Sequence, residues 1–98
     1  MRHFNTRVVL YDATIADYLA LYTEMAKRNF TDQIVGDDGK VWTLPPGEYT
    51  SYGDLTHLQV RDLASAAAAA TGVRFAVRVS EAVVTSWAGL EPGKAKAA

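Results

Sequence analysis

The segment VRFAVRV, residues 73–79, alternates apolar side chains with polar or small ones without a break. Successive side chains of a β-strand point to opposite faces of its sheet, so one face receives the valines and the phenylalanine, and the other receives Arg74, Ala76 and Arg78. Alternation of this kind is typical of a strand with one buried face. The sequence therefore predicts a closing strand that turns two arginines outward.

The chain before this strand predicts a first strand and two helices. Residues 4–11, FNTRVVLY, have the pattern of the first strand. Thr14 and Asp17 have the spacing of a capping box, which predicts a helix from about residue 15. Its expected buried stripe recurs at three and four residues and consists of Ile15, Tyr18, Leu19, Tyr22, Met25 and Ala26. Asp54 is the expected cap of the second helix, which ends at Gly72.

Between the two helices the chain carries hairpin signals. The sequence GDDG at residues 36–39 has the chemistry of a tight turn between an expected strand at 30–35 and a return strand at 40–44. The sequence PPG at residues 45–47 then interrupts the return strand, because proline supplies no donor to a sheet. Extended structure should resume at residues 48–52, so the third strand is expected to be bent or split.

The order of these elements, βαββαβ, favours the α+β class and a ferredoxin-like sandwich, in which two helices cover one face of an antiparallel sheet. The other face is expected to be open. The first and last strands pair antiparallel in this topology, which should bring Arg7 near Arg74 and Arg78 on the open face. A single domain is expected over residues 1–88, and residues 89–98, rich in Ala, Lys and Gly, should form a flexible C-terminal tail.

The overall charge limits how this chain can bind nucleic acid. Ten basic and eleven acidic residues give a net charge of −1, so a basic site must be local. The chain has no cysteine, which excludes disulfides and thiolate chemistry. Residues 1–5, MRHFN, contain no apolar leader, and no apolar run approaches the length of a membrane span, so a cytoplasmic protein without membrane contact is expected.

Four residues on the open face form the first candidate site. Arg7, Arg74 and Arg78, flanked by Asn5, offer planar donors that suit a phosphate or a carboxylate. Residues of this kind are also common as solvated positions of a half-exposed sheet, although like charges on neighbouring strands destabilise it. Because the face is expected to lack a pair of aromatic side chains, contact with a nucleic-acid backbone is expected rather than stacking of bases.

Asp12 is the second candidate, because it directly follows the first strand. A carboxylate in that position can reach past the edge of the sheet to hold Mg²⁺ or Mn²⁺, or to orient a water molecule. It can equally serve as a turn or cap residue.

Aromatic residues gather around the proline break. Trp42, Tyr49 and Tyr52 form either an aromatic surface for a partner or a base, or part of the core, which is where aromatic side chains of small proteins more often lie.

Several short motifs resemble the GhoS family, the antitoxins of type V toxin–antitoxin systems. The motifs, spread over about residues 4–80, are Phe4-Asn5-Thr6-x-Val8-Val9-x-x-Asp12, Met25 with Asn29-Phe30, the turn Asp38-Gly39, and Leu44. The resemblance implies a ferredoxin-like fold akin to that of the CRISPR-associated Cas2 proteins, and an endoribonuclease that cleaves the messenger RNA of a membrane-acting toxin. The end of the first strand, VVLYD at residues 8–12, also resembles Cas2, whose terminal aspartate serves metal-dependent cleavage in a dimer cleft. Where GhoS proteins carry an arginine implicated in cleavage on the first helix, this chain has Tyr22.

The residues and the resemblance together predict an RNA-binding protein that acts as a homodimer. Asn5, Arg7, Arg74 and Arg78 would hold the phosphodiester backbone, and Asp12 would hold a metal ion or water for cleavage. The alternative is a non-catalytic module that binds a second copy or a partner protein in a defence or regulatory setting. A sensor of small molecules at a domain interface is a third reading of the same fold.

Overall fold

The computed structural model describes residues 1–93 of the chain. Within this part, the order of elements is β1 (Arg2–Leu10), α1 (Ile15–Ala26), β2 (Gln33–Val35), β3 (Val41–Thr43), β4 (Glu48–Gly53), α2 (His57–Ala69), β5 (Phe75–Ala82) and β6 (Glu91–Pro92). These elements form an α+β fold with two antiparallel sheets of three strands each, ordered β4-β1-β5 and β2-β3-β6. The structure therefore confirms the predicted class and the two helices, but it contains a second sheet that the sequence did not predict.

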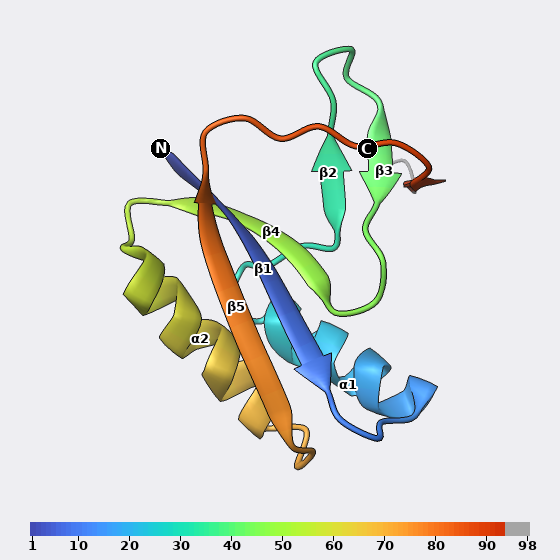
Figure 1. The fold of residues 1–98 in the computed structure, drawn as a ribbon, viewed down its shortest axis with the longest axis vertical. Coiled ribbons are helices and arrows are strands. Elements are labelled where there is room, and N and C mark those ends of the chain that lie inside the picture. The colour runs from blue at the N-terminus through green and yellow to red at the C-terminus, as the bar shows by residue number, and fades with distance from the viewer. Residues whose placement is uncertain (94–98) are drawn as a thin grey trace.

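The first sheet is built around β1, which pairs antiparallel with β4 along one edge and with β5 along the other. Pairing of the first strand with β5 is what the sequence predicted. The two helices cover one face of this sheet (Figure 1). The even-numbered side chains of β1 point to that face, where Phe4, Val8 and Leu10 are buried. We call this the inner face. The odd-numbered side chains, from His3 to Val9, point to the opposite, outer face.

The core fills the space between the inner face and the helices. Three alanines of α2 are fully buried, which lets this helix lie close to the sheet. The buried members of the core are Phe4, Val8, Leu10, Leu21, Met25, Phe30, Tyr49, Val60, Ala64, Ala67 and Ala68.

Both helices begin with a capping box. The Thr14 hydroxyl accepts from the backbone N–H of Asp17, and the Asp17 carboxylate accepts from the N–H of Thr14, as the spacing predicted. Thr56 and Gln59 make the same reciprocal pair at the start of α2. The prediction that Asp54 caps this helix was wrong. The N-cap is Thr56, two residues later, which forms the capping box together with Gln59.

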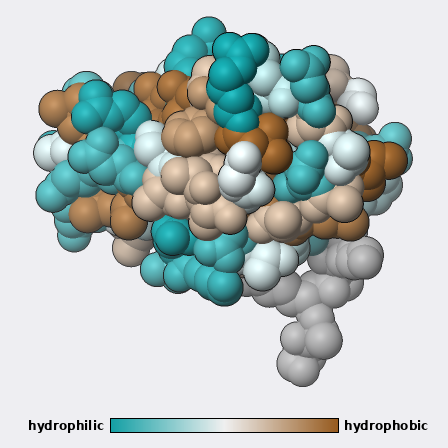
Figure 2. Space-filling view, turned by 90° about the horizontal axis from the view of Figure 1, so that it is seen from below, coloured by the Kyte–Doolittle hydropathy of each residue, from teal (hydrophilic) through white to brown (hydrophobic). Residues whose placement is uncertain are grey.

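The buried stripe predicted for α1 is only partly right. Met25 is buried as expected, whereas Ile15 and Leu19 are 81% and 64% exposed, and Leu21, which the stripe omitted, is fully buried. Figure 2, seen from below the view of Figure 1, shows hydrophobic residues at several separate places with hydrophilic residues between them. Neither helix of residues 1–93 is long and apolar enough to cross a membrane.

β2 and β3 belong to the second sheet and not to the first. The hairpin predicted around residues 36–39 forms, with β2 and β3 paired antiparallel. Leu44 to Gly47 then separate β3 from β4, so the predicted split of the third strand is confirmed. In the described residues one isolated bridge, Thr31 with Thr50, joins the two sheets, and the Thr50 hydroxyl donates to the carbonyl oxygen of Gln33 at 3.0 Å. The two prolines lie between β3 and β4, where residues without an N–H cannot donate to a ladder, so β3 does not continue into β4 as one strand of the first sheet.

The chain after β5 also differs from the expectation. Residues 83–90, which we call the strap, run from the end of β5 toward β3 (Figure 1). Glu91–Pro92 then pair with β3 as β6, and the N–H of Gly93 donates to the carbonyl oxygen of Val41 at 2.8 Å. Residues 91–93 therefore belong to the second sheet and not to a flexible tail, because the free edge of β3 takes up their backbone groups. The rest of the expected tail, residues 94–98, lies outside the described part of the chain.

Gly47 allows a close approach between the turn before β4 and the end of β1. Its φ is +84°, its carbonyl oxygen accepts from the N–H of Val8 at 2.7 Å, and a Cβ at this position would overlap the carbonyl oxygen of Val8. We expect Gly47→Ala to lower the free energy of unfolding by about 3 kcal/mol or more, through left-handed strain and overlap together. Gly39 has a similar φ of +81° but open space around it, so Gly39→Ala should cost only about 1 kcal/mol. Urea unfolding measures both losses, and equal values would contradict the close approach.

Candidate functional site

Arg7 lies in the middle of a charged row across the outer face. Its partners in register are Glu48 on β4 and Arg78 on β5, so the three side chains share that face. Arg7 Nη1 is 3.9 Å from Glu48 Oε2, at the limit of an ion pair, and within residues 1–93 no carboxylate pairs with Arg78. Arg7 therefore has one loosely held carboxylate beside it, and Arg78 has none among residues 1–93. Like charges opposite one another on neighbouring strands destabilise a sheet.

Arg74 lies on the same face but apart from this pair. Its guanidinium carbon is 4.1 Å from the centroid of the Tyr11 ring, which is a cation–π contact, and its carbonyl oxygen accepts from the N–H of Tyr11 at 2.9 Å. Arg74 directly precedes β5 and is four positions before Arg78, which is roughly 13 Å at the rise of a strand. The structure thus brings two of the three predicted arginines together and places the third at the end of the same face.

The fourth predicted ligand, Asn5, is engaged by the strap. Its Nδ2 donates to the Thr85 hydroxyl at 3.3 Å, and its neighbours in register are Thr50 and Ser80. The strap therefore lies against the outer face at this row, and the expectation of an open face was wrong there. Asn5 therefore contacts the strap beside the arginines, and its role as a ligand of a phosphate stays a prediction.

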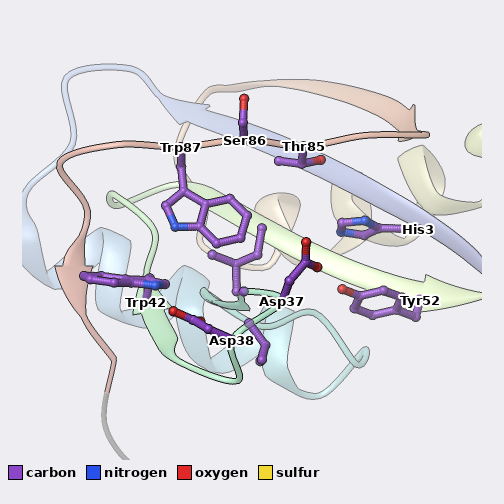
Figure 3. A pocket seen from close by; sticks show the side chains of 11 residues that line it. His3, Asp37, Asp38, Trp42, Tyr52, Thr85, Ser86 and Trp87 are labelled. Carbon is purple, nitrogen blue, oxygen red and sulfur yellow. The ribbon is translucent and has the colours of Figure 1, made fainter.

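The strap borders two cavities on the outer face. A cavity of about 290 Å³ lies beside Arg7, Arg78 and Glu48. A second, of about 590 Å³, lies toward His3, Tyr52 and the turn of the hairpin (Figure 3). Both are also lined by Ile34 and by Thr85, Ser86 and Trp87 of the strap. The two cavities are therefore adjacent, with the strap as their common wall.

Asp12 is exposed in the turn between β1 and α1, with φ +54°. Aspartate tolerates this left-handed conformation better than most residues, because its short side chain can bond locally. The described residues contain no group of three or more His, Cys, Asp or Glu that could hold a metal ion. One exposed carboxylate is not a metal site by itself, so Mg²⁺ or Mn²⁺ does not fit the residues at this turn.

A stacked pair of rings lies on the outer face, where the sequence predicted none. The ring centroids of His3 and Tyr52 are 4.4 Å apart with the planes at 10°, because the two residues are partners in register. Loss of hydration lowers the pKa of His3, whose Nε2 is shielded from solvent and has no hydrogen-bond partner in the described structure. Tyr49, by contrast, lies in the core, and burial raises the pKa of its hydroxyl. The three aromatic candidates therefore fall into two groups: Trp42 and Tyr52 line the cavity of about 590 Å³, and Tyr49 belongs to the core.

Fold and surface together define a small α+β protein with a local basic row on the outer face of its larger sheet. A scan against protein-family models and a search of curated proteins find no match for the chain. The likeness to GhoS antitoxins rests on the short motifs and stays a prediction.

The state of His3 should make stability depend on pH. Its pKa is lower in the folded chain than the ordinary value of 6.5, so the unfolded chain binds the proton first as pH falls. The stability that depends on neutral His3 is therefore complete above the ordinary pKa of 6.5. It is lost as the pH falls from there through the lower pKa of the folded chain. We expect the melting temperature to fall between about pH 7.5 and 5.5, and to fall less in His3→Phe, which keeps a ring against Tyr52.

His57→Gln is the matched control for this prediction. His57 is exposed at the start of α2, so its replacement should leave the pH-dependent fall in place. Thermal melts at several pH values compare the three proteins. If His3→Phe shows the full fall, another group is responsible.

Proposed function

We propose that the protein binds single-stranded RNA along its phosphodiester backbone, on the outer face of the first sheet. The observation that carries this proposal is the pair Arg7 and Arg78, which are partners in register; in the described residues Glu48 is the one carboxylate that pairs with either. This arrangement destabilises the free sheet, and an anion held by both guanidinium groups would offset the repulsion. A phosphate suits the pair because a guanidinium group presents parallel N–H donors to two oxygens at once.

Arg74 extends the proposed site along the strand. Because it lies roughly 13 Å from Arg78, it would contact a different phosphate of the same RNA chain. Tyr11 lies under its guanidinium group at 4.1 Å and holds it on the outer face. Arginine and tyrosine at such a position also offer a surface on which a base can stack without sequence preference.

The charge of the chain sets the strength of this binding. The net charge of the chain is −1, so the contacts must come from the three arginines on this face, which would neutralise two or three phosphates. Each contact contributes about 0.7 to the slope of log affinity against log salt for a single strand, so the total slope should be near −2. RNA is preferred to DNA in this proposal because of the resemblance to GhoS, and the same resemblance gives a toxin messenger RNA as the partner in the cytoplasm.

Within the proposal the first sheet and the two helices correspond to a ferredoxin-like sandwich. Two contacts support this, the pairing of β1 with β5 and the bridge from Thr31 to Thr50, which places the residue two positions before β2 against β4. Endoribonuclease activity stays a prediction from the resemblance. Under a Cas2-like mechanism cleavage would depend on Asp12, whereas a nuclease that needs neither metal nor Asp12 is the other form of this prediction. Asp12 is kept apart from the binding proposal because the described residues hold no cluster of metal ligands around it.

A non-catalytic interaction module is the second candidate. In the described part of the chain, β5 pairs with β1 on one edge and with no strand on the other. Val83 and Val84, which follow it directly, are 97% and 88% exposed. A strand of a second copy could add to this edge and form the predicted homodimer.

Replacement of Arg78 by alanine should weaken RNA binding and flatten its salt dependence. Loss of one phosphate contact should lower the slope by about 0.7, because one fewer counterion is released. The measurement is the fluorescence anisotropy of a labelled single-stranded RNA across a series of salt concentrations, with a DNA of the same sequence in parallel. A gel of the same mixtures, with Mg²⁺ or with EDTA, reports any cleavage and whether Asp12→Asn removes it.

Arg61→Ala is the matched control for Arg78→Ala. Arg61 is an exposed arginine of α2, on the helical side of the molecule, where it pairs with Asp62 at 3.0 Å. The Arg61→Ala substitution removes the same charge from the helical layer, so the salt slope of RNA binding should equal that of the wild type. Arg78→Ala should unfold no more easily than the wild type, since it relieves the repulsion with Arg7. Equal slopes for all three proteins would remove the outer face from the account, and no binding by the wild type would leave the interaction module.

A further inference from the structure

A second surface of opposite chemistry lies on the other side of the strap. The cavity of about 590 Å³ has aromatic walls and two carboxylates near its mouth (Figure 3). The residues that give it this character are His3, Trp42, Tyr52, Trp87, Asp37 and Asp38. They come from β1, β3, β4, the strap and the turn of the hairpin, and no arginine or lysine of the described chain lines the cavity.

The aromatic rings frame the space from three sides. Figure 3 shows Trp87 reaching from the strap into the cavity, Trp42 on one side of it, and the parallel His3 and Tyr52 rings on the other. The hairpin passes next to Trp87 at Gly36: a Cβ there would be 3.5 Å from the Trp87 ring, an ordinary contact distance, and 3.0 Å from Asp38 Oδ1. The turn therefore brings its two carboxylates close to the strap.

The electrostatics of the cavity favour a cation. Asp38 is held in place, since its Oδ1 accepts from the N–H of Lys40 at 3.0 Å, whereas Asp37 is exposed and has no hydrogen bond or ion pair within the described residues. His3 adds no positive charge at neutral pH, because burial lowers its pKa. Two negative charges thus lie beside the electron-rich faces of several rings, and both attract a cation. A phosphate would be repelled, so this site is separate from the proposed RNA site.

We propose that this cavity binds a guanidinium group. Such a group is planar and weakly hydrated, so it can stack on an indole or phenol ring while its edge pairs with a carboxylate. An ammonium ion of the same charge is more strongly hydrated and has no flat face to stack. The group can belong to a free alkylguanidine or to an arginine side chain of another protein, and the two sources present the same chemistry to the cavity.

Tryptophan fluorescence reports on this site, because both of the chain's two tryptophans line the cavity. Trp87 also borders the smaller cavity, so the variants below assign the signal to one of the two. Titration of the full chain with ethylguanidinium should give a saturable change in emission, and N-ethylurea, its uncharged analogue, should give none. A second arm compares the peptides acetyl-Gly-Arg-Gly-amide and acetyl-Gly-Gln-Gly-amide. Tighter binding of the arginine peptide than of ethylguanidinium points to a protein as the source, and equal binding points to a small molecule.

Asp37→Asn tests the charge without disturbing the fold, because this side chain is exposed and makes no bond that the turn needs. It should weaken ethylguanidinium binding about tenfold. Asp54→Asn is the matched control: it removes the same charge at an exposed position outside the cavity and should bind as the wild type does. A change with N-ethylurea equal to that with ethylguanidinium, equal binding by the two aspartate variants, or no saturable change would each overturn the proposal. None of these results would affect the RNA site, which has its own variants.

Discussion

The pairing of β1 along both of its edges is the constraint from which the other features follow. A strand hydrogen-bonded on both sides has its side chains fixed alternately on two faces, so Phe4 and Val8 must enter the core while Arg7 must face outward. The same register sets Arg7 between Glu48 and Arg78 and sets His3 against Tyr52. A slip of one residue in either ladder would exchange the faces, and both the core and the outer surface would be lost together. Gly47 helps to hold this register, because its carbonyl oxygen bonds Val8 where β1 passes the turn before β4.

The sequence was a good guide where local chemistry decides the structure and a poor one where distant segments meet. The alternation at residues 73–79, the Thr14–Asp17 box, the hairpin turn and the break at the prolines were all predictable, because each depends on neighbours in the chain. The sequence also placed Arg7 near Arg78 correctly, since that juxtaposition follows once the first and last strands pair. The strap was missed because its position depends on contacts far along the chain, such as the bond from Asn5 to Thr85 and the pairing of Glu91 with Thr43. The His3–Tyr52 pair was missed for the same reason, since β1 alone shows only one of the two rings.

The strap gives the outer face two neighbouring regions of opposite charge. On one side lie Arg7 and Arg78, and on the other lie Asp37 and Asp38 among aromatic rings. Trp87 lines both cavities, so a ligand that moved the strap would alter both. In a chain with a net charge of −1, separating the charges in this way allows one small protein to present an anion site and a cation site at once. The local basic row is consistent with backbone contact to RNA and does not require an overall positive charge.

The central claim is that RNA lies on the outer face of the first sheet, over Arg7 and Arg78. The most direct measurement is a titration of ¹⁵N-labelled protein with a short single-stranded RNA, followed by the backbone amide and arginine Nε signals in NMR spectra. If RNA lies there, the largest shifts should occur along β1 and β5 around these two arginines and continue to Arg74, while the signals of α1 and α2 stay in place. Shifts concentrated on the helices, or no shifts at an excess of RNA, would contradict it.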